Sequence, residues 1–132
     1  MSILKTLQNF VSKYDGLEIK TDFPGKEAGY ALSPSGNSQS KEDILGNKYY
    51  INNYVFCVKE CARDEVDRAD TQDFLEAFSQ WIEEQPLPDL PGRFSAEKLV
   101  PSNCLLMDIE EDGMGVYQMQ LQLTIRKEVN NG

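Results

Sequence analysis

The sequence predicts one α+β domain over residues 1–132, with a mostly antiparallel or mixed β-sheet packed by two α-helices. The closing segment gives the clearest observation, because apolar and polar side chains alternate over residues 116–125 after an Asp112-Gly113 turn, as in a hairpin. Residues 48–58 are dense in aromatic and β-branched side chains, which is typical of a strand. Two further segments, which begin near Ser2 and Asp70, repeat apolar residues at helical spacing.

The first helix is predicted to begin after Ser2, whose hydroxyl can cap it, and to end near Gly16. Its apolar stripe consists of Ile3, Leu7, Phe10, Val11 and Tyr14. Residues 17–23 then alternate as a short strand, and Pro24-Gly25 turns the chain toward a second short strand at residues 29–32.

A mobile arm is predicted over residues 33–46. Residues 33–40 are rich in turn-forming residues and contain no large apolar side chain, so they can bury little surface in the free protein. Residues 48–58 follow as a long strand with apolar side chains on much of both faces, which predicts a central place in the sheet.

The second helix is predicted to be capped by Asp70 or Thr71, after a charged stretch over residues 61–70. Its apolar stripe consists of Phe74, Leu75, Phe78, Trp81 and Ile82. Residues 85–92 cannot continue the helix, because their prolines remove amide donors and restrict the preceding residues. Residues 95–100 are predicted to pair as an edge segment that Pro101 ends.

The closing hairpin has two unlike faces. An apolar set is predicted to lie under the helices, namely Tyr117, Met119, Leu121, Leu123 and Ile125. The other face carries Gln118, Gln120 and Gln122, a polar but uncharged strip that a partner can cover without burying charge. Polar strand faces are also common in exposed antiparallel sheets, so exposure and an interface both stay open. If the strip is an interface between copies, Gln120→Lys weakens self-association.

The charge of the chain limits its partners. Lys and Arg total 13 against 22 Asp and Glu, a net charge of −9, which disfavours a surface that binds nucleic acid by neutralising phosphates. No apolar run is long enough to span a bilayer, and the first residues lack the apolar core of a signal peptide. We therefore expect a soluble protein that is made in the cytoplasm. It is expected to show no sequence-specific binding of nucleic acid and no binding of membranes.

No catalytic, cofactor-binding or metal-binding residues are predicted. The chain has no histidine, no CxxC pair and none of the common phosphate-binding or hydrolase motifs. Cys57, Cys61 and Cys104 are expected to be buried reduced thiols, and the acidic clusters to be solvated. Trp81 and the tyrosines of residues 48–58 are expected to pack in the core, although an aromatic excess on the second strand face is also typical of an interface.

Three segments carry a resemblance to a known family: residues 54–59 (YVFCVK), 74–82 (FLEAFSQWI) and 112–121 (DGMGVYQMQL). They stand in the order of a short helix, a hairpin with a polar arm, a long aromatic strand, a Phe/Trp helix, a proline-rich link and a closing hairpin. This order resembles the minor capsid or tail-completion proteins of siphophages, which include tail terminators similar to that of phage lambda. The resemblance covers nearly the whole chain and consists of hydrophobicity and element order.

The resemblance implies a structural virion protein without enzymatic activity. Tail terminators form a ring, typically of six subunits, that caps the tail tube, ends tail polymerisation and forms the head-tail joining surface. The implied partners are other copies, the tail tube protein and the head-tail connector protein, at the head-proximal end of the tail. The candidate interface residues lie in the arm and on strand faces: Ser35, Asn37, Gln39, Tyr50, Asn52, Tyr54, Gln118, Gln120 and Gln122.

Two alternatives stay open. A head-tail connector stopper or a tail tube protein shares the virion setting but occupies another position. A small enzyme or ligand-binding domain predicts instead a closed pocket with convergent polar groups and carboxylates of shifted pKa.

Overall fold

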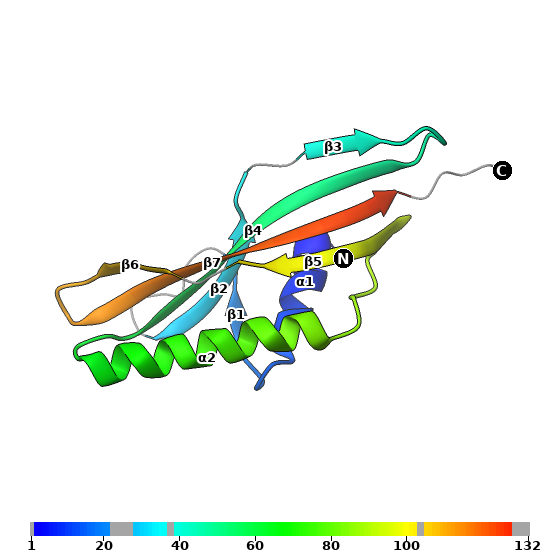
Figure 1. Cartoon of the computed structure of the whole chain (residues 1–132). Helices are drawn as coiled ribbons and strands as arrows, with labels where there is room; N and C mark the ends of the chain where they lie inside the picture. Colours follow the sequence, from blue (N-terminus) through cyan, green and yellow to red (C-terminus); the bar gives the residue numbers. More distant parts are fainter. Residues whose placement is uncertain (1, 22–27, 37–38, 103–104, 128–132) are drawn as a thin grey trace.

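The computed structural model describes residues 2–21, 28–36, 39–102 and 105–127, and it confirms the α+β class (Figure 1). The helices are α1 (Ile3–Ser12) and α2 (Glu65–Glu84). The strands are β1 (Ile19–Lys20), β2 (Gly29–Pro34), β3 (Gln39–Glu42), β4 (Lys48–Cys61), β5 (Phe94–Pro101), β6 (Leu105–Ile109) and β7 (Met114–Lys127). All of them belong to one sheet of order β1-β2-β4-β7-β5, with β3 paired to β4 and β6 paired to β7.

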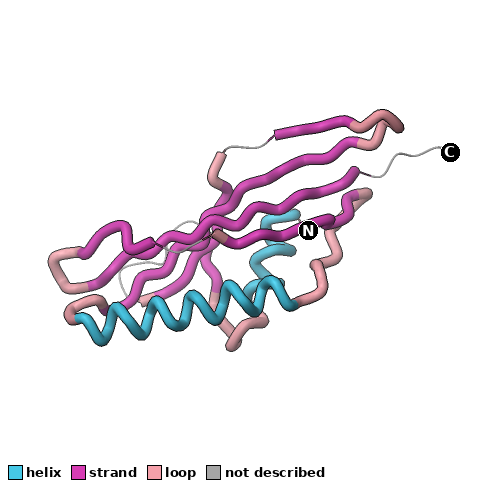
Figure 2. The backbone as a smooth tube through the Cα atoms, in the orientation of Figure 1, coloured by secondary structure: helices cyan, strands magenta, loops and turns pink. Residues whose placement is uncertain are grey.

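The two long strands β4 and β7 form the axis of the sheet. They pair antiparallel over their whole length, from Lys48 opposite Lys127 to Cys61 opposite Met114. The first part of β4 also pairs with β3 and the second part with β2, while β7 pairs first with β6 and then with β5. The sheet is therefore elongated, as the tube view shows (Figure 2), and the predicted central position of residues 48–58 is confirmed.

Both helices pack on the same face of the sheet. The predicted alternation of β7 is confirmed, because its apolar set is at most 1% exposed: Tyr117, Met119, Leu121, Leu123 and Ile125. Phe78 of α2 lies at the centre, stacked on Phe56 of β4 at 4.7 Å between ring centroids and in edge contact with Tyr14 at 5.2 Å. Because α1, α2 and the sheet share this cluster, neither helix packs on the second face of the sheet.

The start of α2 differs from the prediction. The helix begins at Glu65, with Asp64 as its N-cap, and Asp70 and Thr71 lie inside it. The Asp64 carboxylate accepts a hydrogen bond from the amide of Asp67 at 2.8 Å, which satisfies one of the free amides of the first turn. The apolar stripe starts only in the third turn, so periodicity alone placed the helix start too late.

The N-terminal strands also differ from the prediction. Within the described part of the strand expected over residues 17–23, β1 pairs parallel with β2, so these two strands do not form a hairpin. Residues 22–23 lie outside the described residues. The Pro24-Gly25 turn lies outside the described residues. Strand β2 extends to Pro34, two residues beyond the predicted end, because its last residues continue the ladder with β4.

Part of the predicted arm is strand β3, whose four residues are exposed and pair with the start of β4. Asp43 closes the hairpin between them, accepting hydrogen bonds from the amides of Leu45 and Asn47 at 2.9 Å each. The side-chain hydrogen bond from Asn47 is the main cause that lowers the pKa of Asp43. The arm thus pairs with the sheet in this structure, and its mobility stays a prediction.

Candidate functional site

The candidate site is the sheet face that lies opposite the helices, which we call the open face. It consists of Ile51, Asn53, Val55 and Cys57 of β4 and Gln118, Gln120, Gln122 and Thr124 of β7. The register places Asn53 beside Gln122, Val55 beside Gln120, and Cys57 beside Gln118. Since the alternate residues of β7 are buried under the helices, these side chains point to the other side of the sheet.

The eight residues named for the open face include no charged side chain, although the chain has 22 acidic and 13 basic residues. Charged residues border this uncharged patch on the same face: Lys98 pairs with Thr124, and Lys59 and Arg126 continue the two rows at their ends. Ser33 of β2 pairs with Val55, and Val100 of β5 pairs with Gln122, so the uncharged surface continues across four strands. Within it, the amide of Gln122 donates a hydrogen bond to Asn53 Oδ1 at 3.3 Å. Depletion of charge combined with polar and apolar side chains is typical of the centre of a protein interface.

The glutamine strip is where the sequence placed it. Gln118, Gln120 and Gln122 are all exposed. The periodicity of β7 was sufficient to find them, because residues that alternate with a buried set must share the opposite face.

The β4 residues chosen from the sequence lie on the face that the helices cover. Tyr54 is only 5% exposed and belongs to the core, and its burial raises its pKa. Tyr50 packs edge-on against Phe94, with ring centroids 6.2 Å apart, and Asn52 pairs with buried Leu123. Because β4 is apolar on much of both faces, its sequence did not show which set meets the helices.

Sequence reasoning missed the odd-numbered residues of β4, above all Asn53 and Val55. Their position depends on the pairing of β4 with β7, which no local pattern in residues 48–58 encodes. The usable signal was the glutamine strip itself, since any strand paired with β7 extends that strip to its own facing residues.

The residues chosen in the arm lie apart from the glutamine strip. The amide of Ser35 donates to the carbonyl of Asn53 at 2.9 Å, so Ser35 borders the edge of β4. Gln39 begins β3, is exposed and pairs with Ile51. Asn37 lies outside the described residues.

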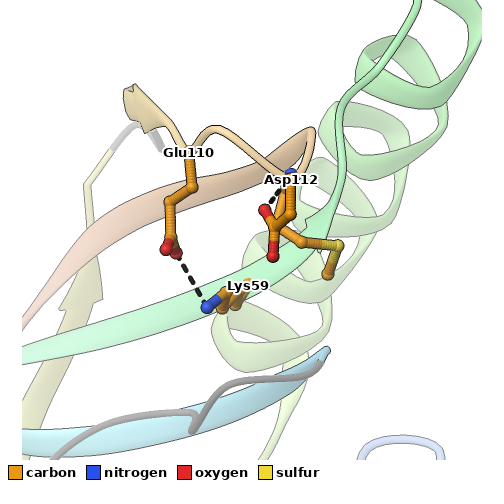
Figure 3. Close-up of polar contacts among 4 residues, drawn as sticks. Lys59, Glu110 and Asp112 are labelled. Carbon is orange, nitrogen blue, oxygen red and sulfur yellow. Dashed lines mark hydrogen bonds and ion pairs between the residues drawn. The ribbon is translucent and has the colours of Figure 1, made fainter.

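An ion pair borders the open face at the end of β4 (Figure 3). Lys59 Nζ lies 2.8 Å from Glu110 Oε1; the Lys59 side chain is 8% exposed and that of Glu110 is 39% exposed. In the same turn, Asp112 Oδ1 accepts a hydrogen bond from the amide of Met114 at 3.0 Å. The ion pair holds the β6–β7 turn against β4, and the Asp112 hydrogen bond orders the turn itself.

Reactive chemistry has little support in the described part of the chain. Burial raises the pKa of the Cys57 thiol, which disfavours the nucleophilic thiolate. Cys57 and Cys61 are free and half-buried rather than fully buried as expected, and Cys104 lies outside the described residues. In residues 2–21, 28–36, 39–102 and 105–127, no group of three or more acidic or cysteine side chains lies close enough together to hold a metal ion.

Few titratable side chains line two grooves of the described surface. One groove of about 380 Å³ lies between α2 and β7, and Glu76 is the titratable residue among those that line it. A second, of about 370 Å³, lies beside Trp81 and the proline-rich link, where Lys13 and Asp89 are its charged residues. One titratable side chain in the first groove and two in the second are a small set for acid–base chemistry.

Within the described ranges, neither helix is both long and apolar enough to cross a bilayer. No protein-family model matches the chain, and no curated protein matches it.

Proposed function

We propose that the protein is a structural component of a phage tail, which caps the tail tube as an oligomeric ring, ends tail polymerisation and forms the head-tail joining surface. The proposal starts from the resemblance of residues 54–59, 74–82 and 112–121 to tail-completion proteins. The single structural observation that supports it is the open face, whose central residues form an uncharged patch across four strands of a strongly acidic protein.

A ring that caps a tube needs two kinds of contact, one between its subunits and one with the tube. We assign the open face to the contact with the tail tube protein. Burying a charged side chain without a partner is costly, whereas the amides of Gln118, Gln120 and Gln122 can hydrogen-bond to a partner's backbone or side chains. The Gln122–Asn53 hydrogen bond orders one part of this surface in advance.

Tail length in the absence of the protein tests the proposal. The gene is deleted from the phage or prophage that carries it, and tails are imaged by electron microscopy. Tubes of uncontrolled length are the expected result. Tails of normal length that fail to join heads would instead place the protein at a stopper position, and absence of tubes would identify it as a tube component; either outcome overturns termination.

Complementation with variants then tests the open face. Gln120→Lys places a charge at its centre and is expected to leave tails unterminated. Gln80→Lys, the same change at an exposed position of α2, is the matched control and is expected to restore normal tails. If Gln120→Lys restores tail length as well as the control does, the open face is not the contact with the tube.

A further inference from the structure

Charge is distributed unevenly along the axis of the sheet. Nearly half of the 13 basic residues lie where β3, β5 and the outer ends of β4 and β7 meet, a region that we call the basic end: Lys41, Lys48, Arg93, Lys98, Arg126 and Lys127. Among the described residues, the acidic ones of this region are Glu42, Asp43 and Glu97. In a chain of net charge −9, this end therefore has a positive balance.

The opposite end of the axis is strongly acidic. The β6–β7 turn and the start of α2 meet there and form the acidic end, with Asp64, Glu65, Asp67, Asp70, Asp108, Glu110, Glu111 and Asp112. The two parts are joined by hydrogen bonds, from the Ala62 amide to the Gly113 carbonyl at 2.9 Å and from the Arg63 guanidinium to the Asp112 carbonyl. Figure 1 shows the β3–β4 hairpin and the β6–β7 hairpin at opposite ends of the protein.

The basic residues within the acidic end are already engaged by the protein itself. Lys59 pairs with Glu110, the Arg63 guanidinium donates to a turn carbonyl, and Arg68 donates to the carbonyl of Ala62 at 3.0 Å. The carboxylates of Asp108 and Glu111 are on exposed residues. With the eight carboxylates named above against Lys59, Arg63 and Arg68, this end keeps a negative balance.

Exposed apolar side chains lie at the same two ends. At the basic end, the hydrogen-bonded turn of Asp43 presents Ile44 and Leu45, which are 102% and 85% exposed. The acidic end presents four more, with exposures between 47% and 68%: Val66, Leu105, Met107 and Ile109. Each end therefore combines apolar side chains with surrounding charge, the composition of a protein interface.

The two ends cannot compensate each other within one copy. Strand β4 has 14 residues, so the ends of the axis lie about 45 Å apart, whereas the screening length at physiological salt is about 8 Å. Between two copies, however, the opposite charges can meet directly. Edge strands β3 and β6, each paired on one side only among the described strands, reach these ends with open backbone edges.

We infer that copies of this protein join head to tail, with the basic end of one copy docked on the acidic end of the next. Ile44 and Leu45 of the hairpin tip then pack against the apolar side chains of β6, and the charges surround them. A contact between two different surfaces of the same protein closes into a ring when its rotation is suitable. The inference rests on the proposed ring for its biological role, and it moves the contact between copies from the glutamine strip to the two ends.

Sedimentation of the purified protein at two salt concentrations is the first test. We expect larger species at about 0.05 M salt and smaller ones at about 0.5 M, because exposed opposite charges are screened as salt rises. A protein that is monomeric at both concentrations, or whose assembly does not respond to salt, overturns the head-to-tail contact.

Charge reversal at each end is the decisive test. Asp108→Lys with Glu111→Lys removes most of the negative charge of the acidic end, and Lys41→Glu with Lys48→Glu makes the basic end net negative; neither variant changes the Lys59–Glu110 pair. Each alone is expected to weaken association about tenfold or more, because attractive pairs become repulsive. Mixing the two variants is expected to restore association, which unfolded proteins cannot do. Failure of the mixture to associate overturns the inference.

Two controls separate this contact from other causes. Glu83→Lys changes the net charge by the same amount as each single substitution in the end variants, but at an exposed position of α2 outside both ends. It is expected to leave sedimentation unchanged. Ile44→Ser with Leu45→Ser is expected to weaken association without lowering the melting temperature, because both side chains are exposed. If the wild type assembles but no end variant changes its assembly, the head-to-tail contact fails while the proposed function is decided separately by tail length.

Discussion

The Lys59–Glu110 ion pair predicts unequal effects for the removal of its two partners. The Lys59 side chain is 8% exposed and that of Glu110 is 39% exposed, with 2.8 Å between Nζ and Oε1. When Lys59 is removed, the carboxylate can be hydrated where it stands. When the charge of Glu110 is removed, the ammonium stays at a largely buried position, where water replaces the lost partner poorly.

The expected changes in the free energy of unfolding follow from this difference in exposure. Glu110→Gln is expected to lower the free energy of unfolding by about 1–2 kcal/mol, less than the roughly 3–5 kcal/mol of a fully buried broken pair, because Glu110 is partly hydrated. Lys59→Met keeps most of the side-chain volume while it removes the buried charge, so the free energy of unfolding should stay within about 1 kcal/mol of the wild type.

Urea denaturation followed by circular dichroism measures both effects, and the double variant completes the cycle. The double variant is expected to resemble Lys59→Met alone, because Glu110→Gln costs little once the ammonium is absent. A Lys59→Met variant that is as unstable as Glu110→Gln, or less stable, would refute the reasoning, since it would show that the buried charge itself contributes to stability.

Three further predictions concern the same end of the sheet. Gly115→Ala is expected to destabilise the protein by about 1–3 kcal/mol in urea denaturation, because the new Cβ would lie 2.7 Å from Cβ of Ala62; an unchanged midpoint would contradict this. Asp64→Ala should cost about 1 kcal/mol by removing the cap of α2, whereas Asp64→Asn, which keeps an acceptor, should cost less. Burial and Glu60 raise the pKa of Tyr30 to about 12 from its model-compound value of 10.0. The stability that Tyr30 contributes is therefore complete below pH 10 and lost as the pH rises toward 12; Tyr30→Phe should show a weaker alkaline loss in thermal melts between these values.

The fold was largely predictable from periodicity, and the errors of that prediction have local causes. The alternation of residues 116–125 and the stripe of α2 placed their side chains correctly, because these periods reflect the geometry of a strand and a helix. The start of α2 was misplaced because its first turn carries charged, exposed residues and depends on the cap at Asp64. The parallel pairing of β1 with β2 was missed, because two short strands with a turn between them suggest a hairpin.

On β7 the residues of the open face were predicted from the sequence, whereas on β4 the set that lies on the opposite face was chosen. Gln118, Gln120 and Gln122 alternate with a clearly apolar set, so the face on which they lie could be predicted from the sequence. Strand β4 has apolar residues on both faces, so Tyr54 was chosen although it is buried, and Val55 was overlooked although it lies beside Gln120. A strand of this kind acquires a defined inner face only through the strand and helices that it meets.

The sequence by itself determined the α+β class, the apolar faces of β7 and α2, the Asp112-Gly113 turn and the acidic charge, because each depends on residues close together in the chain or on composition. Only the tertiary structure decided which β4 residues join the glutamine strip and how charge divides between the two ends. Asn53 and Gln122 are 69 positions apart, yet they share a hydrogen bond on the open face. Such pairings arise from the long-range register of β4 on β7, and local patterns carry no record of that register.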